Sequence, residues 1–275
     1  MRYVLRYFGP ALLFVFLTVL TQIGGVAYLI GTAIASAVPM LRGGEPIRRM
    51  SAVVLGLTAY VVMTAFIVPP LAASMGRVPL PCSTAGNGSI VAATWLTCAL
   101  NRGYVRPQVR DLVMDLASAT AQRFPGSKIT TLEGNLPFID GFPLLPHLSH
   151  RDGKKVDIAF FYRSVADDAA VPSGSPSSMG YFIYEQPRPG DPTPCENRWT
   201  PLRWNFNGLQ PQPPVWRLDE ERTAWTVNWL KDDPRVDRIF IEPHLAERMG
   251  VAGGKVRFQG CQAARHDDHI HVQVP

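Results

Sequence analysis

The sequence predicts an α+β domain with a mostly antiparallel sheet, preceded by two transmembrane helices. Two observations predict this fold class in a chain of 275 residues. Two long runs without charged residues fall within the first 76 positions, and clustered helical and strand patterns follow them. We expect a membrane hairpin at residues 1–76, a linker and domain edge at 77–106, and the folded domain at 107–275.

The uncharged runs extend from Tyr7 to Leu41 and from Met50 to Gly76. Each is longer than the roughly 20 residues that cross a bilayer, whereas a cleaved signal peptide has an apolar core of only about 7–15 residues. The first run is long for one crossing, so we expect a tilted helix or a bend near Gly24 and Gly25. The runs therefore favour a hairpin of two membrane helices.

Charge sets the expected orientation of this hairpin. Of the 27 basic and 22 acidic residues in the chain, five arginines and Glu45 lie in residues 1–76, which leaves 22 and 21 for the rest. The basic balance therefore belongs to the N-terminal part and does not indicate nucleic-acid binding. Three arginines between positions 42 and 49 favour the cytoplasmic side, although Arg2 and Arg6 pull the N-terminus to that side as well. Two crossings would place the N-terminus and everything after residue 76 outside the cytoplasmic membrane.

The four cysteines, Cys82, Cys98, Cys195 and Cys261, all follow the second uncharged run. None belongs to a C-x-x-C pair, so a zinc site made of cysteines is not expected. An even number in an exported domain suggests two disulfides. Of the three possible pairings we expect Cys82–Cys98, which are close in sequence, and Cys195–Cys261, which would fix the C-terminal loop. Four reduced, buried cysteines are the alternative.

The elements of the domain follow from local patterns. Pro107 suits the first position of a helix, and apolar residues at helical spacing continue that helix to Gln122. Acidic residues after Asp219 open a second helix, which runs to about Lys231. Strand patterns occur at Lys128–Leu132, Val156–Tyr162, Tyr181–Glu185 and Val236–Ile241, and the chain ends in a further strand.

Two stretches are predicted to be irregular. Val171–Met179 is rich in Ser, Pro and Gly and should be an exposed loop. Residues 186–216 contain many prolines together with Trp199, Trp204, Phe206 and Trp216. This second stretch is either a long loop clamped on the domain by its aromatic side chains or a wall that lines a substrate site.

Five of the six histidines fall in two short blocks, residues 147–158 and 265–274. The second block runs out as a short alternating strand. Residues two apart on a strand point to the same face, so His269 and His271 would project together. Imidazole with carboxylate is a usual donor set for zinc. We therefore expect one Zn²⁺ per chain.

A catalytic zinc site needs three protein ligands and one position left for water. His150, Asp157 and His271 can supply two nitrogens and one carboxylate. Zinc lowers the pKa of a bound water to about 7, which makes a nucleophile available at neutral pH. His269, on the same strand face as His271, is placed to give or take a proton.

Two motifs resemble those of the penicillin-insensitive murein endopeptidases, Ser149-His150-x-x-Gly153-x-x-Val156-Asp157-Ile158 and His266-Asp267-Asp268-His269-x-His271-Val272. These enzymes share one zinc fold with lysostaphin-type enzymes, D-alanyl-D-alanine carboxypeptidases and the hedgehog domain. The resemblance covers roughly residues 105–275 and implies that fold. The chain departs from the family at Leu145-Pro146, where a Gly-Gly pair is usual, at Lys154-Lys155, and in its membrane hairpin.

The resemblance also implies roles for the histidines and a function. With the membrane hairpin and orientation expected from the uncharged runs, the chain would be a membrane-tethered metallopeptidase that cuts peptide bonds in peptidoglycan, on the periplasmic side of a bacterial inner membrane. One alternative is a carboxypeptidase that trims terminal D-alanine; another, by analogy with the hedgehog domain, is a non-catalytic zinc-stabilised binding module. By resemblance, His150, Asp157 and His271 ligate zinc, His269 is the catalytic partner, and His147 and His266 are accessory histidines.

Overall fold

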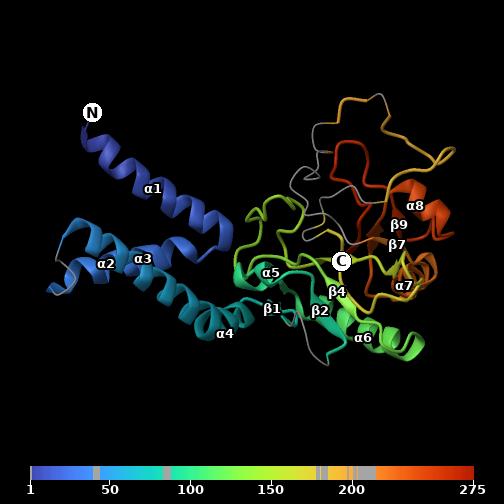
Figure 1. The fold of residues 1–275 in the computed structure, drawn as a ribbon, viewed down its shortest axis with the longest axis horizontal. Helices are drawn as coiled ribbons and strands as arrows, with labels where there is room; N and C mark the ends of the chain where they lie inside the picture. Colours follow the sequence, from blue (N-terminus) through green and yellow to red (C-terminus); the bar gives the residue numbers. More distant parts are fainter. Residues whose placement is uncertain are drawn as a thin grey trace.

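In this computed structural model, helices formed by the first 74 residues extend to one side of an α+β domain (Figure 1). The structure describes residues 2–39, 44–82, 88–177, 180, 185–196, 198–200, 203 and 215–275, with side chains from residue 8 onward. The domain contains a mixed six-stranded sheet, two small two-stranded sheets and short covering helices. The α+β class predicted from the sequence is therefore confirmed.

The two long membrane helices expected from the sequence are not confirmed. The first uncharged run folds into two helices, α1 (Arg2–Thr21) and α2 (Gly24–Ala37). In the described part of the chain, only Glu45–Ser74 is both long and apolar enough to cross a membrane. That stretch consists of α3 (Glu45–Val62), a π-helical segment η2 (Met63–Ile67) and α4 (Val68–Ser74).

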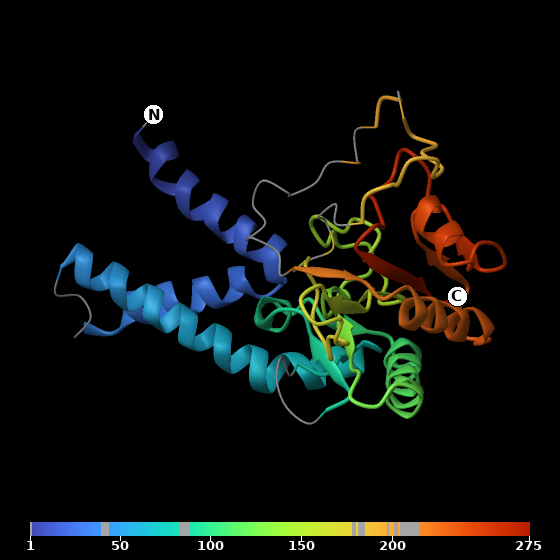
Figure 2. The same cartoon turned by 45° about the vertical axis from the view of Figure 1, so that its right-hand side comes forward.

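The break between α1 and α2 has a local cause. Gln22 has a φ of 64°, a left-handed conformation that ends a helix. Gly24 then approaches α1 so closely that a Cβ would lie 2.8 Å from the carbonyl oxygen of Leu17, and its N–H donates to Thr21 Oγ1. The bend expected near Gly24 is thus a reversal: α1 runs toward the domain and α2 runs back away from it (Figures 1 and 2).

Small residues allow α2 to pack closely on α3. Ala27, Gly31 and Ala35, four residues apart, are buried on one face of α2. A Cβ on Gly31 would lie 2.4 Å from the carbonyl oxygen of Ala52 and 2.4 Å from the backbone nitrogen of Gly56. Such close approach of two backbones is the usual way in which apolar helices associate without large side chains between them.

The domain-facing ends of these helices are attached to the domain. Ile23, Val68 and Ala72 form a buried apolar cluster with Tyr104 of the domain. The backbone N–H of Phe138 donates to Gln22 Oε1 over 2.9 Å. These contacts place the α1–α2 reversal and the C-terminal part of the long helix against the domain.

The main sheet has the strand order β2-β4-β5-β10-β8-β9. Its centre is antiparallel, whereas the outer pairs β2–β4 and β8–β9 are parallel, so the sheet is mixed rather than mostly antiparallel. The strands are β2 (Ile90–Ala92), β4 (Ile129–Thr131), β5 (Lys155–Ala159), β10 (His269–Gln273), β8 (Arg238–Phe240) and β9 (Val256–Arg257); the small sheets pair β1 (Val78–Pro79) with β3 (Tyr104–Val105) and β6 (Tyr162–Ser164) with β7 (Trp216–Leu218).

Two helices cover the sheet and complete the core. The helix predicted from Pro107 is α6 (Pro107–Arg123), and the second predicted helix is α7 (Glu220–Asp232). Asp219 caps α7 by accepting a hydrogen bond from the Arg222 N–H. The core contains Leu112, Leu116, Val156, Ile158 and Ile270, and the short helices α5 (Trp95–Ala99) and α8 (Pro243–Arg248) lie nearer the edges (Figure 1).

Several predicted segments need separate comment. The strand expected over Val156–Tyr162 is split into β5 and β6, because Phe161 donates its N–H to Thr223 Oγ1 instead of a strand partner. Of the strand expected at Tyr181–Glu185, residues 181–184 lie outside the described residues, as do Trp204 and Phe206. Trp199 is 81% exposed, so it does not clamp its loop on the domain.

Both expected disulfides are present, Cys82–Cys98 and Cys195–Cys261. The second one closes a separation of 66 residues and joins the proline-rich stretch to the loop that precedes His266. The alternative of four reduced cysteines is therefore wrong.

The packing of α2 on α3 predicts the effect of one methyl group. Gly31→Ala should lower the free energy of unfolding by about 1–3 kcal/mol, because the methyl group overlaps backbone atoms that cannot move independently. Gly9→Ala is the matched control, since nothing lies within 4 Å of a Cβ at that position in α1. Thermal unfolding in lipid nanodiscs measures both. An unchanged midpoint for Gly31→Ala would contradict the close contact.

Candidate metal centre

The site forms where two central strands pair. β5 and β10 are antiparallel neighbours, and the register sets His271 opposite Asp157. His271 Nδ1 lies 2.8 Å from Asp157 Oδ1. His269, two residues earlier on β10, shares this face, as its strand spacing predicts. Two segments 114 residues apart in sequence are thereby brought into one buried cluster.

The loop before β5 supplies His150. Its Nδ1 lies 2.6 Å from the carbonyl oxygen of Gly134, which can only accept, so Nδ1 carries a proton and Nε2 is the nitrogen that offers a lone pair in the neutral ring. Nε2 lies 3.1 Å from His271 Nδ1 and 3.2 Å from Asp157 Oδ1. A backbone carbonyl that fixes one imidazole nitrogen while the other faces the site is typical of metal-binding histidines.

A buried asparagine, Asn135, holds this loop in place. Its Oδ1 accepts from the Gly153 N–H over 3.0 Å, and its Nδ2 donates to the carbonyl oxygen of Lys155 over 2.9 Å. Gly153 has a φ of 77°, which favours glycine at the turn into β5. These contacts fix the position from which Asp157 enters the site.

Three donor atoms therefore converge: His150 Nε2, Asp157 Oδ1 and His271 Nδ1. Their mutual distances are 2.8, 3.1 and 3.2 Å. Ligands about 2.1 Å from a tetrahedral zinc ion lie about 3.4 Å from one another, so the spacing fits such an ion. The wider cluster contains two groups that could hold a metal, His147 with His150 and Asp157, and His266 with His269 and His271.

The electrostatics of the cluster suit a cation. Burial opposes the charged form of Asp157, yet electrostatic interactions with His150, His269 and His271 and a hydrogen bond from His147 hold the pKa of Asp157 well below its usual range. Burial lowers the pKa of His271 to about 4, although Asp157 opposes that shift. The site thus combines an ionised carboxylate with a neutral imidazole, the states that metal ligation requires.

His269 is held in a different way. Its Nδ1 lies 2.6 Å from Asp268 Oδ1, and its Nε2 lies 3.6 Å from Asp157 Oδ1. Burial alone would lower the pKa of His269, but the negative charges of Asp157 and Asp268 raise that pKa to about 9. Asp268 therefore orients the ring and keeps its Nε2 directed toward the donor atoms.

The two remaining cluster histidines occupy opposite sides. His147 Nδ1 lies 3.0 Å from Asp157 Oδ2. His266 donates its backbone N–H to Glu242 Oε1, and burial holds the pKa of its imidazole well below the usual value. The sixth histidine, His244, lies apart on α8, where its Nε2 is 2.9 Å from the carbonyl oxygen of Glu185.

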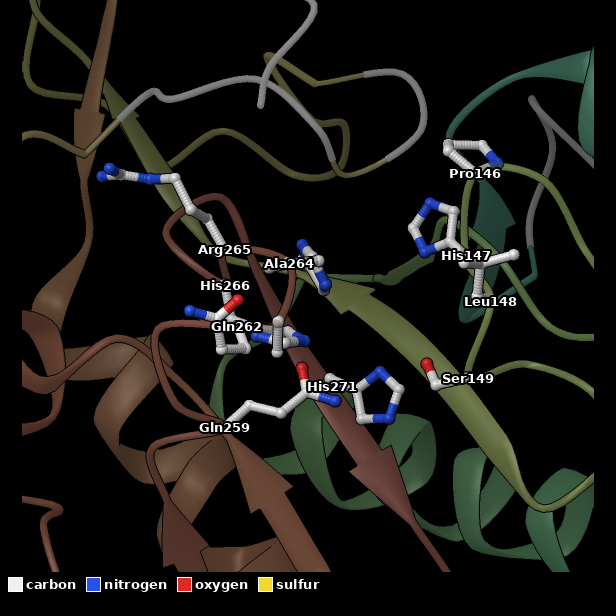
Figure 3. A pocket seen from close by; sticks show the side chains of 12 residues that line it. Pro146, His147, Leu148, Ser149, Gln259, Gln262, Ala264, Arg265, His266 and His271 are labelled. Carbon is white, nitrogen blue, oxygen red and sulfur yellow. The ribbon is translucent and has the colours of Figure 1, made fainter. Parts of the chain in front are cut away.

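A cavity of about 150 Å³ lies beside the cluster. Figure 3 shows it between two walls, with His271 on the strand between them. One wall is the segment from Pro146 to Ser149, and the other contains Gln259, Gln262, Arg265 and His266. The Cys195–Cys261 disulfide lies within this second wall's loop.

The backbone of Gly180 also covers the cluster. A Cβ there would lie 3.0 Å from His269 Nδ1 and 3.3 Å from His147 Cε1, and its φ is 78°. Its N–H donates to the buried Ser177 Oγ over 2.8 Å. Sequence reasoning missed Gly180 and Asn135, because a single glycine or asparagine carries no distinguishing pattern. Asp268 lay within the second motif, but no role was predicted for it.

All six residues singled out from the sequence therefore lie in one buried cluster, which could hold a metal ion. The geometry does not identify that ion. No protein-family model matches the chain, and no curated protein sequence matches it. The chemical roles of the cluster consequently rest on its own distances, burial and charges.

Proposed function

We propose that the chain is a membrane-tethered zinc metallopeptidase that hydrolyses peptide bonds in peptidoglycan. The observation that carries this proposal is the convergence of His150 Nε2, Asp157 Oδ1 and His271 Nδ1 within 3.2 Å of one another. These atoms would hold one zinc ion. Zinc bound in this way lowers the pKa of a coordinated water to about 7.

The chain's own contribution to proton transfer would come from His269. Asp268 fixes the proton on His269 Nδ1, so Nε2 is the nitrogen that takes and returns a proton at the site. A cation beside Asp157 would cancel part of the attraction that raises the pKa of His269. That pKa would then lie closer to neutral pH. His147 and His266, on the two walls, would steer the substrate.

The paired Asp268 and His269 favour an enzyme over a zinc-stabilised binding module. A structural zinc needs its ligands, whereas an imidazole oriented toward the ligands without joining them has a use in proton transfer. Cleavage within a cross-link and removal of a terminal D-alanine both fit this arrangement. Analysis of the reaction products distinguishes these two activities.

The helices and disulfides support a location at a membrane, with the domain on its oxidising side. One helix is long and apolar enough to cross, and both disulfides lie beyond it. The α1–α2 reversal contacts the domain, so the start of α1 and the start of α3 lie at the opposite end (Figure 1). Arg2 and Arg6 then lie on the same side as Arg48 and Arg49. Both groups of arginines can therefore face the cytoplasm, which a two-crossing hairpin with an external N-terminus does not allow.

This arrangement predicts a topology that differs from a two-helix hairpin. A tag before Met1 should be protected from protease in intact spheroplasts, while a tag after Pro275 should be digested. Both tags should be digested after lysis, which controls for access. Digestion of both tags in intact spheroplasts would restore the two-crossing hairpin.

The donor geometry predicts which variants lose metal. His150→Ala, Asp157→Ala and His271→Ala should each purify with little zinc and no hydrolytic activity. His269→Ala should keep close to one zinc per chain yet lose roughly 10²–10⁴-fold in rate, the usual effect of removing a positioned acid–base group. Elemental analysis and rate measurements separate the two classes. Zinc lost from His269→Ala and retained by His271→Ala would reverse the assignment.

The proposed reaction is tested with purified murein and the full chain in detergent. Soluble muropeptide fragments should appear, a chelator should abolish them, and added zinc should restore them. Mass spectrometry of the fragments identifies the bond that is cut. If the zinc-loaded chain cleaves neither murein nor muropeptides, while still retaining its zinc, the binding module is the better explanation.

A further inference from the structure

A group of apolar side chains on the domain is exposed rather than buried in its core. Among the described residues after position 76, nine large apolar side chains are exposed, and five of these lie on two segments, α5 and residues 138–148. These residues are Trp95, Leu96, Ile139, Leu145 and Leu148, each between 44% and 66% exposed. We call these five residues the apolar base.

Both segments are attached directly to the helices. Tyr60 Oη on α3 donates to the carbonyl oxygen of Ala99 at the end of α5 over 2.6 Å. Asn101 Nδ2 lies 3.2 Å from Tyr60 Oη and 3.3 Å from Thr64 Oγ1. Phe138 donates its N–H to Gln22, beside Ile139. Helix α5 and the start of the 138–148 segment therefore lie on the side of the domain that faces the helices, where Figure 1 shows α5.

The length of the long helix sets the depth of these contacts. Arg48 and Arg49 mark a charged boundary near the start of α3. A hydrocarbon core about 30 Å thick takes up about 20 residues of helix, which extends from Arg49 to about residue 69. Tyr60 and Thr64, which bind the end of α5, fall inside this interval, and a tilted helix would move them still deeper.

Apolar side chains of the long helix are also exposed nearer the domain than Tyr60. These are Val61, Val62, Phe66 and Ile67. A bilayer that covers these residues also reaches the neighbouring α5. Tryptophan is enriched where membrane meets water, because its apolar ring and polar N–H suit that boundary.

We propose that the apolar base is a lipid-binding surface, which holds the domain against the membrane interface. The partner is the bilayer itself. Leu148, at the other end of the 138–148 segment, lines the cavity next to His147, so the apolar base extends from the helices to the mouth of the cavity. Resting on the proposed function, this placement implies that the peptide substrate is presented at the membrane surface, as on a lipid carrier.

The tryptophans allow a direct test. All six follow residue 94, so tryptophan fluorescence reports on the domain and not on the helices. The full chain is reconstituted in vesicles whose acyl chains carry bromine near the headgroup, which quenches tryptophan on contact. We expect brominated lipid to quench the natural chain. Trp95→Phe should lose most of that quenching, whereas Trp199→Phe, which removes another exposed tryptophan, should retain it.

Each outcome decides a separate point. Equal quenching of the two variants, or no quenching of a chain that floats with the vesicles, overturns the lipid-binding surface and leaves the membrane anchor standing. A chain that does not float overturns the anchor and this inference together. Since quenching requires neither metal nor hydrolysis, failure of the proposed peptidase reaction leaves the result unaffected.

Discussion

The structure depends on one buried charge, the carboxylate of Asp157. An ionised group completely removed from water is stable only if other charges and hydrogen bonds replace its hydration. Here the replacement comes from four histidines, His147, His150, His269 and His271, which surround its two oxygens at 2.8 to 3.6 Å. The pairing of β5 with β10 brings two of these histidines, His269 and His271, next to the Asp157 carboxylate.

The same constraint explains which polar residues are buried elsewhere in the domain. Asn135 accepts a hydrogen bond from the backbone of Gly153 in the turn that precedes Asp157. The carbonyl oxygen of Gly134 accepts a hydrogen bond from His150, and the carboxylate of Asp268 accepts one from His269. Each of these contacts orients a group that faces the carboxylate without itself reaching it. A substitution of Asn135, Gly134 or Asp268 would therefore disturb the geometry of the cluster without replacing any of its histidines or Asp157.

The cluster could be predicted from the sequence because its residues fall in two short blocks and because strand spacing of two fixes their faces. Helices α6 and α7 could be predicted for a similar reason, since Pro107 and Asp219 mark their starts. A bend near Gly24 and Gly25 could be predicted, but not a full reversal, because no sequence pattern marks the left-handed conformation of Gln22. The parallel edge strands β2 and β9 are only three and two residues long, too short to show a period.

One wall of the cavity depends on the Cys195–Cys261 disulfide, which forms only after the chain has been made. One wall of the cavity lies on the loop that this bond ties to a segment 66 residues earlier. Disulfides form in oxidising compartments and are kept reduced in the cytosol. In the proposed topology, a newly made chain would lack this tether until its domain has crossed the membrane. Completion of this wall would then be coupled to export of the domain.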